Sequence, residues 1–494
     1  MRGTIYLGVL MLMLSKGLAQ RLVLPGDNPD PSVVKIGDNY WASATTSNWM
    51  PAFPLYKSND LKSWQTVGHI FKELPAWADY YFWAPEMTYD NGKVYVYYSA
   101  HKKNGNLCVG IASADKPEGP YKDHGPLICE EAGSIDAFPM RDENGKLHLV
   151  WKEDGNSVGK PTPIWMQELN EERTAVLGQK KLLFRNDAPW EGNLVEGVSM
   201  MRHGNYIYAF YAAAGCCGRG CDYQSGIARS KTLAGPWEKY ASNPVLVNEG
   251  RWTCPGHGTP VEKDGKFYFL YHAYDSSGTV YTGRQGILKE FVFTSDNWIK
   301  FVDEPNAPSP ALPIISDGFK GNALHNDWQW SVFNTAKHTV ENGQLSLTAL
   351  LGSAAFVARK ASFTNYTAGV KLLRKRSGAA AGISLVGDEK NHVATYIHND
   401  SIVLLQTKEG KDSVLVARSF ALSKKGYLRM QVGNGKDVSF YFGNNKRSLK
   451  LLNPQPFNAA YLPPWDRALR VALITKAGEG KAVFDCFEIK GDRR

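Results

Sequence analysis

Outside its first residues the sequence has no long apolar run. No segment after the N-terminus holds the roughly 18 uninterrupted apolar residues of a transmembrane helix, which predicts a protein without a membrane span. The apolar run from Ile5 to Leu14 is too short to cross a bilayer, and it lies between Arg2 and a small-residue stretch that ends at Ala19. This pattern is typical of a signal peptide, so we predict a leader over residues 1–19 and a secreted or periplasmic protein.

The sequence also lacks a charge cluster of the size that binds nucleic acid. Its formal net charge of +9 is spread along the chain apart from short groups such as Arg374-Lys375-Arg376, so we expect no nucleic-acid partner. The 494 residues are too many for one compact core and indicate two or three domains. Aromatic residues are plentiful at 12%, which suits a sugar-stacking surface and an all-β core alike.

Cysteines are few, and their spacing is not typical of a disulfide framework or a zinc site. Their number is odd, so at least one stays unpaired or pairs between chains; they are Cys108, Cys129, Cys216, Cys217, Cys221, Cys254 and Cys486. Three of them share the short loop 215–221, where export makes a disulfide within the loop the favoured interpretation. Metal binding by the vicinal pair, which has no accompanying histidine, and a fully reduced loop are the alternatives.

A five-fold repeat dominates residues 20–304. A turn containing glycine is followed each time by an aromatic-rich strand, and the repeat begins at Gly37, Gly92, Gly145, Gly204 and Gly265, at spacings of 55, 53, 59 and 61 residues. Repeats of this length with several strands apiece predict a five-bladed β-propeller. A solenoid would need helical or one-strand repeats, which the sequence lacks. A second recurring segment, at 58–64, 113–121 and 230–237, is expected in the outer part of a blade.

The repeat ends at a proline-rich segment. Residues 305–315 contain Pro305, Pro308, Pro310 and Pro313 and are expected to form a stiff linker. Residues 316–494 keep the alternation of strands but lose the repeat, which predicts a single antiparallel β-sandwich. The fold class is therefore all-β: a five-bladed β-propeller followed by a β-sandwich.

Three carboxylates stand out from their surroundings. Asp30 lies between Pro29 and Pro31, a context in which a turn is the simpler explanation. Asp136 and Glu196 are single acids within apolar or small-residue stretches, where an unpaired buried charge is costly; the alternative is an edge-strand carboxylate in solvent. In a propeller the inner ends of different blades meet at the axis. Two carboxylates that flank one bond are what glycoside hydrolysis requires.

An ordered set of motifs, one per blade from about residue 23 to residue 303, resembles glycoside hydrolase family 43. The motifs are Asn28-Pro-Asp-Pro-Ser32, Phe82-Trp-Ala-Pro-Glu86, Ser134-Ile-Asp136, Val195-Glu-Gly197 and Pro255-Gly-His257. The resemblance implies a propeller that hydrolyses with inversion, with Asp30 as general base, Glu196 as general acid, and Asp136 as the residue that tunes the pKa of the acid and orients it. Inversion further predicts about 6.5–9.5 Å between base and acid, and a raised pKa for Glu196.

The resemblance also points to substrate-binding residues. Arg284 and Trp83 match an arginine that reaches into the sugar pocket and an aromatic that walls it, while His257 matches a histidine near the central channel that binds water, calcium or substrate. Trp49 in the first-blade loop is a further candidate wall, and the neighbouring Phe53 is expected in the core. Structural alternatives are a surface arginine for Arg284 and a turn-packed histidine for His257. No cofactor is required, and calcium at His257 is the one metal suggested.

The start of the second domain, from Asp317 to Trp330, resembles the concanavalin-like sandwich of xylosidase-type members of this family. Such a sandwich either closes one side of the pocket or only supports the propeller, and both readings stay open. Glu86 has no separate chemical role. The predicted activity is exo removal of β-D-xylosyl or α-L-arabinofuranosyl residues from plant cell-wall oligosaccharides or polysaccharides. The alternatives are an endo-arabinanase, an exo-galactanase, or a non-catalytic carbohydrate-binding protein; the oligomeric state stays open.

Overall fold

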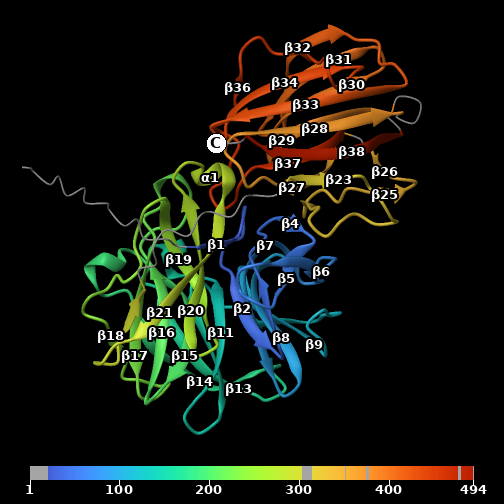
Figure 1. Ribbon diagram of the computed structural model, residues 1–494. Helices are drawn as coiled ribbons and strands as arrows, with labels where there is room; N and C mark the ends of the chain where they lie inside the picture. The colour runs from blue at the N-terminus through green and yellow to red at the C-terminus, as the bar shows by residue number, and fades with distance from the viewer. Residues whose placement is uncertain (1–20, 303–313, 351, 374–377, 477–479, 493–494) are drawn as a thin grey trace, which may run out of the picture.

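The structure is a computed structural model, and it describes residues 21–302, 314–350, 352–373, 378–476 and 480–492. The predicted signal peptide and most of the predicted linker lie outside these residues. Nearly all the ordered secondary structure is β-strand, in two bodies that follow each other along the chain (Figure 1). In the described part of the chain no helix is both long and apolar enough to cross a membrane.

The N-terminal body contains five antiparallel sheets of four or five strands, which confirms the predicted five-bladed propeller. The sheets consist of β2 (Ser32–Ile36), β3 (Asn39–Ser43), β5 (Ala52–Ser58) and β6 (Gln65–Phe71); β7 (Ala78–Asp90), β8 (Lys93–Lys102), β9 (Leu107–Ala114) and β10 (Lys122–Ile128); β11 (Ser134–Arg141), β12 (Leu147–Glu153), β13 (Pro163–Leu169) and β14 (Val176–Arg185); β15 (Val195–His203), β16 (Tyr206–Ala213), β17 (Gln224–Ser230) and β18 (Glu238–Lys239); and β19 (Trp252–Lys263), β20 (Lys266–Asp275), β21 (Arg284–Phe293), β22 (Ile299–Phe301) and β1 (Arg21–Leu24).

The five blades form a closed ring. The first strands of successive sheets contact one another in the order β2, β7, β11, β15 and β19, and β19 returns to β2. The ring is fastened by the N-terminal strand β1, which pairs with β21 of the last blade. The short helical turns of the described residues lie in the connections: η1 (Gly155–Val158), η2 (Pro189–Glu191), η3 (Gly218–Gly220) and α1 (Thr279–Thr282).

The repeated glycines occupy equivalent turns. Each one lies between the first and second strand of its blade and has a positive φ, from 56° at Gly204 to 83° at Gly145, which favours glycine because it carries no Cβ. The strand that follows each glycine is the second strand of the blade. The segments at 58–64, 113–121 and 230–237 join the third strand to the fourth, which is the outer position expected from the sequence.

The C-terminal body is a sandwich of two antiparallel sheets around one core that includes Trp328, Phe440 and Phe484. One sheet contains β23 (Ile315–Asp317), β25 (His338–Glu341), β26 (Gln344–Thr348), β28 (Tyr366–Leu373), β33 (Lys425–Gly433), β34 (Asp437–Gly443), β35 (Lys450–Leu451), β36 (Phe457–Asn458) and β38 (Lys481–Gly491). The other contains β27 (Ala354–Lys360), β29 (Ala380–Asp388), β30 (Asn391–His398), β31 (Ser401–Lys408), β32 (Lys411–Ser419) and β37 (Arg470–Lys476). The predicted β-sandwich is confirmed.

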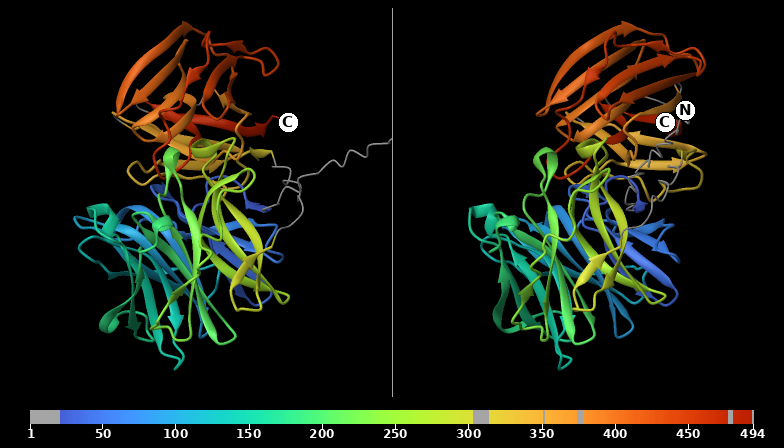
Figure 2. Two further views of the ribbon diagram at one scale, coloured as in Figure 1. Left: turned by 90° about the vertical axis from the view of Figure 1, so that its left-hand side faces the viewer. Right: turned by 60° about the vertical axis from the view of Figure 1, so that its left-hand side comes forward.

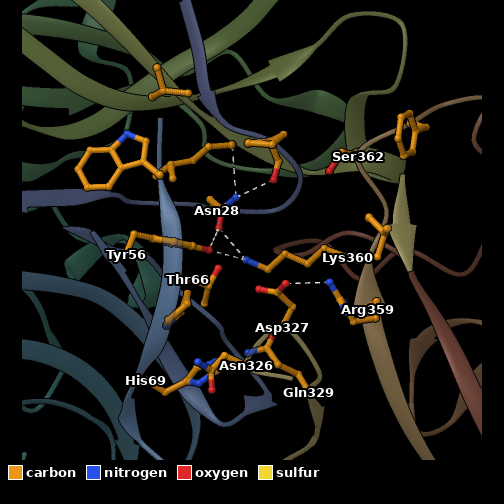
Figure 3. A pocket seen from close by; sticks show the side chains of 17 residues that line it. Asn28, Tyr56, Thr66, His69, Asn326, Asp327, Gln329, Arg359, Lys360 and Ser362 are labelled. Carbon is orange, nitrogen blue, oxygen red and sulfur yellow. Dashed lines mark hydrogen bonds and ion pairs between the residues drawn. The ribbon is translucent and has the colours of Figure 1, made fainter. Parts of the chain in front are cut away.

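The sandwich sits against one end of the propeller (Figure 2). A two-stranded ladder crosses the seam, because β4 (Trp49–Met50) pairs with β24 (Trp330–Ser331). A pocket of about 250 Å³ lies at the same seam and is lined by both bodies. Figure 3 shows that Lys360 of the sandwich reaches Asn28 of the propeller, whose Oδ1 accepts hydrogen bonds from Lys360 Nζ (2.6 Å) and the Tyr56 hydroxyl (2.5 Å). The sandwich therefore braces the turn that carries Asp30.

Candidate active site

The three carboxylates occupy irregular backbone at the inner ends of their blades. Asp30 has a φ of 51° just before β2, and Asp136 has a φ of 56° in β11. Glu196 lies at the start of β15, where the pairing with β16 shifts register between Glu196 and Ser199; β11 shifts in the same way between Ile135 and Phe138. Such bulges change the direction of a side chain from the one it would have in a regular strand. The local strain is therefore located where three acids turn towards one cavity.

Asp30 is held by donors on several sides. Thr45 Oγ1 donates to its Oδ2 (2.6 Å), Arg284 Nη1 to its Oδ1 (3.1 Å), and its own backbone N–H donates to His272 Nδ1 (3.0 Å). Burial alone would raise the pKa of Asp30, but Arg284, with help from His272 and His257, outweighs it and holds the pKa well below its usual range. Asp30 is therefore a carboxylate fixed in its ionised form.

Glu196 and Asp136 have different surroundings. Lys152 Nζ donates to Glu196 Oε2 (2.5 Å), and the Tyr223 hydroxyl donates to Glu196 Oε1 (2.8 Å). Asp136 Oδ2 accepts from the backbone N–H of Gly197 (3.0 Å). Burial raises the pKa of Asp136 to about 6, with His257 opposing the rise and the charge of Glu196 adding to it. The two acids are neighbours whose charges interact.

The expected rise in the pKa of Glu196 is wrong for this structure. Burial acts to raise the pKa of Glu196. The charge and the hydrogen bond of Lys152, together with the hydrogen bond of the Tyr223 hydroxyl, lower it by more, so the net shift is downwards. Lys152 is 1% exposed and is itself held by Asp154 Oδ1 (2.8 Å). Lys152 was not predicted from the sequence, although a lysine directly after the apolar run Leu149-Val150-Trp151 was a detectable signal. In the substrate-free site Asp136 therefore holds a proton more readily than Glu196.

His257 lies between two of the carboxylates. Its Nδ1 is 3.6 Å from Asp30 Oδ1 and 3.9 Å from Asp136 Oδ2. A Cβ on Gly197, which has a φ of 61°, would come within 2.7 Å of the His257 ring, so only glycine fits beside Glu196. Within the described residues no group of three or more His, Cys, Asp or Glu side chains is placed to hold a metal ion. His257 therefore has two carboxylates as its neighbours in the site.

Arg284 links Asp30 to two other walls of the site. Besides Asp30, its guanidinium donates to the backbone oxygen of Asp466 (3.1 Å) in the sandwich and to Cys216 Sγ (3.5 Å). Ser47 Oγ of the propeller in turn donates to Asp466 Oδ2. Arg284 is 5% exposed, so the alternative of a free surface arginine is excluded. The sandwich thus contributes directly to the site, which answers the question that the sequence left open.

These residues enclose one pocket of about 360 Å³. Its lining includes the three carboxylates and the residues around them: Asp30, Asp136, Glu196, Lys152, Asp154, His257, Arg284, Tyr81, Trp83, Cys216, Cys217, Trp465 and Asp466. Trp83 Nε1 donates to Ser47 Oγ (3.2 Å), and its ring meets the ring of Trp465 edge to face at 5.9 Å. Propeller and sandwich therefore each supply an aromatic wall.

Trp49 does not reach this pocket, contrary to the prediction. It is 2% exposed and lies in the seam, where its ring packs against Phe356 and under the guanidinium of Arg470. The reason is that β4 pairs with β24, which turns this tryptophan towards the sandwich. Phe53 is fully buried among propeller aromatics, as expected. Nothing in the propeller sequence signals that a second domain covers Trp49.

The cysteines pair more extensively than their spacing suggested. Three disulfides join Cys108 to Cys129, Cys216 to Cys217, and Cys221 to Cys254, and Cys486 is free and exposed. The bridge expected within the loop 215–221 is therefore the vicinal pair, and the third cysteine of the loop bonds to the first strand of the last blade. The scattered spacing of the cysteines did not indicate these bridges, because the propeller fold brings segments that are distant in the sequence close together. The loop is anchored where it lines the pocket.

Three acids around one cavity, one held ionised by its donors and two whose charges interact, are the groups that a hydrolase of glycosidic bonds would need. The model of glycosyl hydrolases family 43 matches residues 19–299, more than half of the chain, and that of the beta xylosidase C-terminal concanavalin A-like domain matches residues 316–463. The chain belongs to glycosyl hydrolase family 43.

Curated relatives and solved structures extend this likeness over most of the chain. A xylosidase/arabinosidase 43B of Humicola insolens is 24% identical over 87% of this chain and 88% of its own length. A non-reducing end alpha-L-arabinofuranosidase of Bacteroides ovatus is 27% identical over 82% and 81%. The crystal structure of a xylan beta-1,4-xylosidase from Bacillus halodurans superposes with a TM-score of 0.80, at 23% identity, over 95% of this chain and 99% of that one.

Proposed function

We propose that the protein is an exo-acting, inverting glycoside hydrolase that releases terminal β-D-xylosyl or α-L-arabinofuranosyl residues from plant cell-wall glycans. The observation that carries the proposal is the pocket of about 360 Å³ in which Asp30, Asp136 and Glu196 line the same cavity. Trp465 and Asp466 of the sandwich add a wall to it, which favours a chain end over a continuous chain. The names of the relatives in Humicola and Bacteroides support these two sugars.

In the proposed reaction Asp30 takes a proton from a water molecule while the hydroxyl oxygen bonds to the anomeric carbon. Glu196 gives a proton to the glycosidic oxygen, whose bond to that carbon breaks. Asp30 suits the first role because its donors keep it ionised. Glu196 suits the second role only when it is protonated. The hydrogen bond from Lys152 to Glu196 therefore has to break when substrate binds, and the proton of the Asp136–Glu196 pair has to pass to Glu196.

This arrangement predicts opposite pH effects for two substitutions. The pair keeps one proton up to about pH 6, the raised pKa of Asp136, so kcat/KM should fall as the pH rises through that value. Lys152→Met removes the cation that lowers the pKa of Glu196, so the fall of kcat/KM should occur at a pH higher by about one unit or more. Asp136→Asn removes a neighbouring negative charge, so the fall of kcat/KM should occur at a lower pH. Profiles of kcat/KM between about pH 4 and pH 8 check both shifts, and two shifts in one direction contradict the assignment.

Around the reacting centre we assign sugar binding to three side chains. Arg284 presents a planar fork of donors, one of which already contacts Asp30, and Trp83 presents a ring face at the pocket wall. His257, between Asp30 and Asp136, is placed to donate to the attacking water or to a sugar hydroxyl. Calcium at His257 stays a prediction. We also keep export by a signal peptide over residues 1–19 as a proposal, because the glycans concerned lie outside the cell.

The product profile tests the proposal against its alternatives. The wild-type protein is incubated with β-1,4-xylo-oligosaccharides, linear α-1,5-arabinan and β-1,3-galactan, and released sugars are separated by chain length. We expect single xylose or arabinose units from the start. A ladder of arabino-oligosaccharides would indicate an endo-arabinanase, and release of galactose alone an exo-galactanase. Binding of these glycans without release of any sugar would indicate a non-catalytic carbohydrate-binding protein.

A further inference from the structure

We propose that a run of aromatic side chains leads from the pocket across the seam to the sandwich and binds the part of the glycan chain that lies beyond the cleaved bond. The inference rests on the proposed function, because it adds binding positions for the leaving part of the same substrate. It follows from a continuous series of ring contacts that starts in the catalytic pocket and ends in a second pocket on the sandwich.

The series has four members, here called the aromatic path: Trp83, Tyr81, Tyr80 and Phe333. Trp83 and Tyr81 line the catalytic pocket and stack at 4.4 Å between ring centroids. Tyr81 meets Tyr80 at 4.7 Å, and Tyr80 meets Phe333 of the sandwich at 5.7 Å. The three propeller rings are partly exposed and Phe333 is 53% exposed, so each member has surface available to a ligand.

The backbone holds the aromatic path in place. Strand β7 shifts register between Tyr80 and Trp83, and the positive φ of Tyr81 (57°) lets neighbouring tyrosines both face outwards while Phe82 is fully buried. Asn48 fixes both sides of the seam at this point: its Oδ1 accepts from the backbone N–H of Tyr81 (3.0 Å), and its backbone oxygen accepts from the N–H of Val332 (3.0 Å). A rigid surface of this kind binds a ligand with a small loss of conformational entropy.

The far end of the path opens on a polar pocket of about 500 Å³ that Phe333 lines together with Glu389, His392, Asp412 and Lys476. His392 is 1% exposed, its Nε2 contacts Thr407 Oγ1 (3.1 Å), and its Nδ1 has no hydrogen-bond partner within the described residues. Carboxylates, an ammonium group and an imidazole together offer both acceptors and donors. The hydroxyl groups of a ligand can form hydrogen bonds with both the acceptors and the donors.

This combination fits an oligosaccharide better than a peptide or a lipid. A pyranose or furanose ring has an apolar C–H face that packs on an aromatic ring, and hydroxyl groups at its rim that need hydrogen bonds. The path begins at Trp83, beside the pocket that takes the terminal sugar, so the remaining sugars of the same chain are the ligand that continuity favours. The protein should therefore prefer long chains over disaccharides.

The test compares chain lengths in three variants. Tyr80→Ala and Phe333→Ala each remove one ring of the path, and Tyr89→Ala is the matched control because Tyr89 is a 46% exposed tyrosine near the other end of the same strand. For each protein kcat/KM is measured on xylo-oligosaccharides and α-1,5-arabino-oligosaccharides of two and six sugars. We expect the ratio of six-sugar to two-sugar kcat/KM to fall roughly two- to ten-fold for each path variant and to stay unchanged for Tyr89→Ala.

An unchanged ratio in both path variants overturns the inference and leaves the proposed function intact. If wild-type protein cleaves neither series, the proposed function fails instead. In that case calorimetric titration of the Glu196→Gln protein with the six-sugar compounds tests whether the aromatic path binds a glycan chain. Weaker binding after Tyr80→Ala or Phe333→Ala supports the path in that case, and equal binding or no binding to the parent protein overturns it. Thermal unfolding of each variant identifies a loss of folding, and a variant that unfolds early is replaced by Tyr80→Leu or Phe333→Leu.

Discussion

Glu196→Gln should lower kcat on a natural disaccharide by about 10²- to 10⁴-fold, the usual contribution of a general acid. Glutamine keeps the size of the side chain, and its single amide oxygen can accept from either Lys152 or Tyr223, but its amide group is not an acid that can protonate the leaving oxygen. A nitrophenyl glycoside needs no such proton, because nitrophenolate is a good leaving group. The loss on that substrate should therefore be much smaller, and comparison of kcat on the two substrates measures the difference.

Glu86→Gln is the control for this experiment. Glu86 is 8% exposed, accepts from Thr259 Oγ1 (3.0 Å), and is not among the residues that line the catalytic pocket. Burial raises its pKa to about 8, although the Thr259 hydroxyl opposes the rise, so at pH 7 this residue is a neutral acid that an amide can replace. Its kcat should stay near that of wild type. Equal losses on both substrates for Glu196→Gln would contradict its role as the acid.

Asp30→Asn should also lower kcat by about 10²- to 10⁴-fold, and here the loss should be similar for natural and nitrophenyl substrates. The amide oxygen can still accept from one of the two donors, Thr45 or Arg284, but the amide cannot take a proton from water. In the proposed reaction Asp30 acts on the water and not on the leaving group, so a better leaving group should not compensate for its loss. Steady-state kinetics on both substrates check this expectation.

Binding separates a loss of chemistry from a loss of structure in this variant. Asp30 is the charge partner of the buried Arg284, so its replacement also leaves a buried cation without a carboxylate at that position. Calorimetric titration of the Asp30→Asn protein with xylotriose, under conditions where this variant does not hydrolyse the sugar, should give an affinity near that of Glu196→Gln. A kcat within about ten-fold of wild type would contradict the role of Asp30 as the base.

The sequence allowed the prediction of the propeller because its signals are local and repeated. Each of the five glycines marks a turn that needs a positive φ, and the aromatic strand after each turn alternates with a period of two. The sites of Asp30, Asp136 and Glu196 could be located because each acid interrupts an apolar or proline-flanked stretch. In the structure these interruptions are irregular backbone and bulges at the inner ends of blades.

What could not be predicted depends on contacts between distant segments. The pKa of Glu196 depends on Lys152, which belongs to another blade, and the sequence does not give their distance of 2.5 Å. The wall formed by Trp465 and Asp466 comes from the second domain, more than 160 residues beyond the last blade. Trp49 was misplaced for the same reason, since the partner of its strand lies in the sandwich.

The anomeric configuration of the first product tests the central claim most directly. Proton NMR spectra are recorded within minutes of adding wild-type protein to xylobiose, before mutarotation mixes the two anomers. Attack of water activated by Asp30, opposite the bond that Glu196 protonates, predicts that the released sugar from a β-linked substrate appears first as the α-anomer. Appearance of the β-anomer first would mean retention through a covalent intermediate, and would contradict the roles assigned to Asp30 and Glu196.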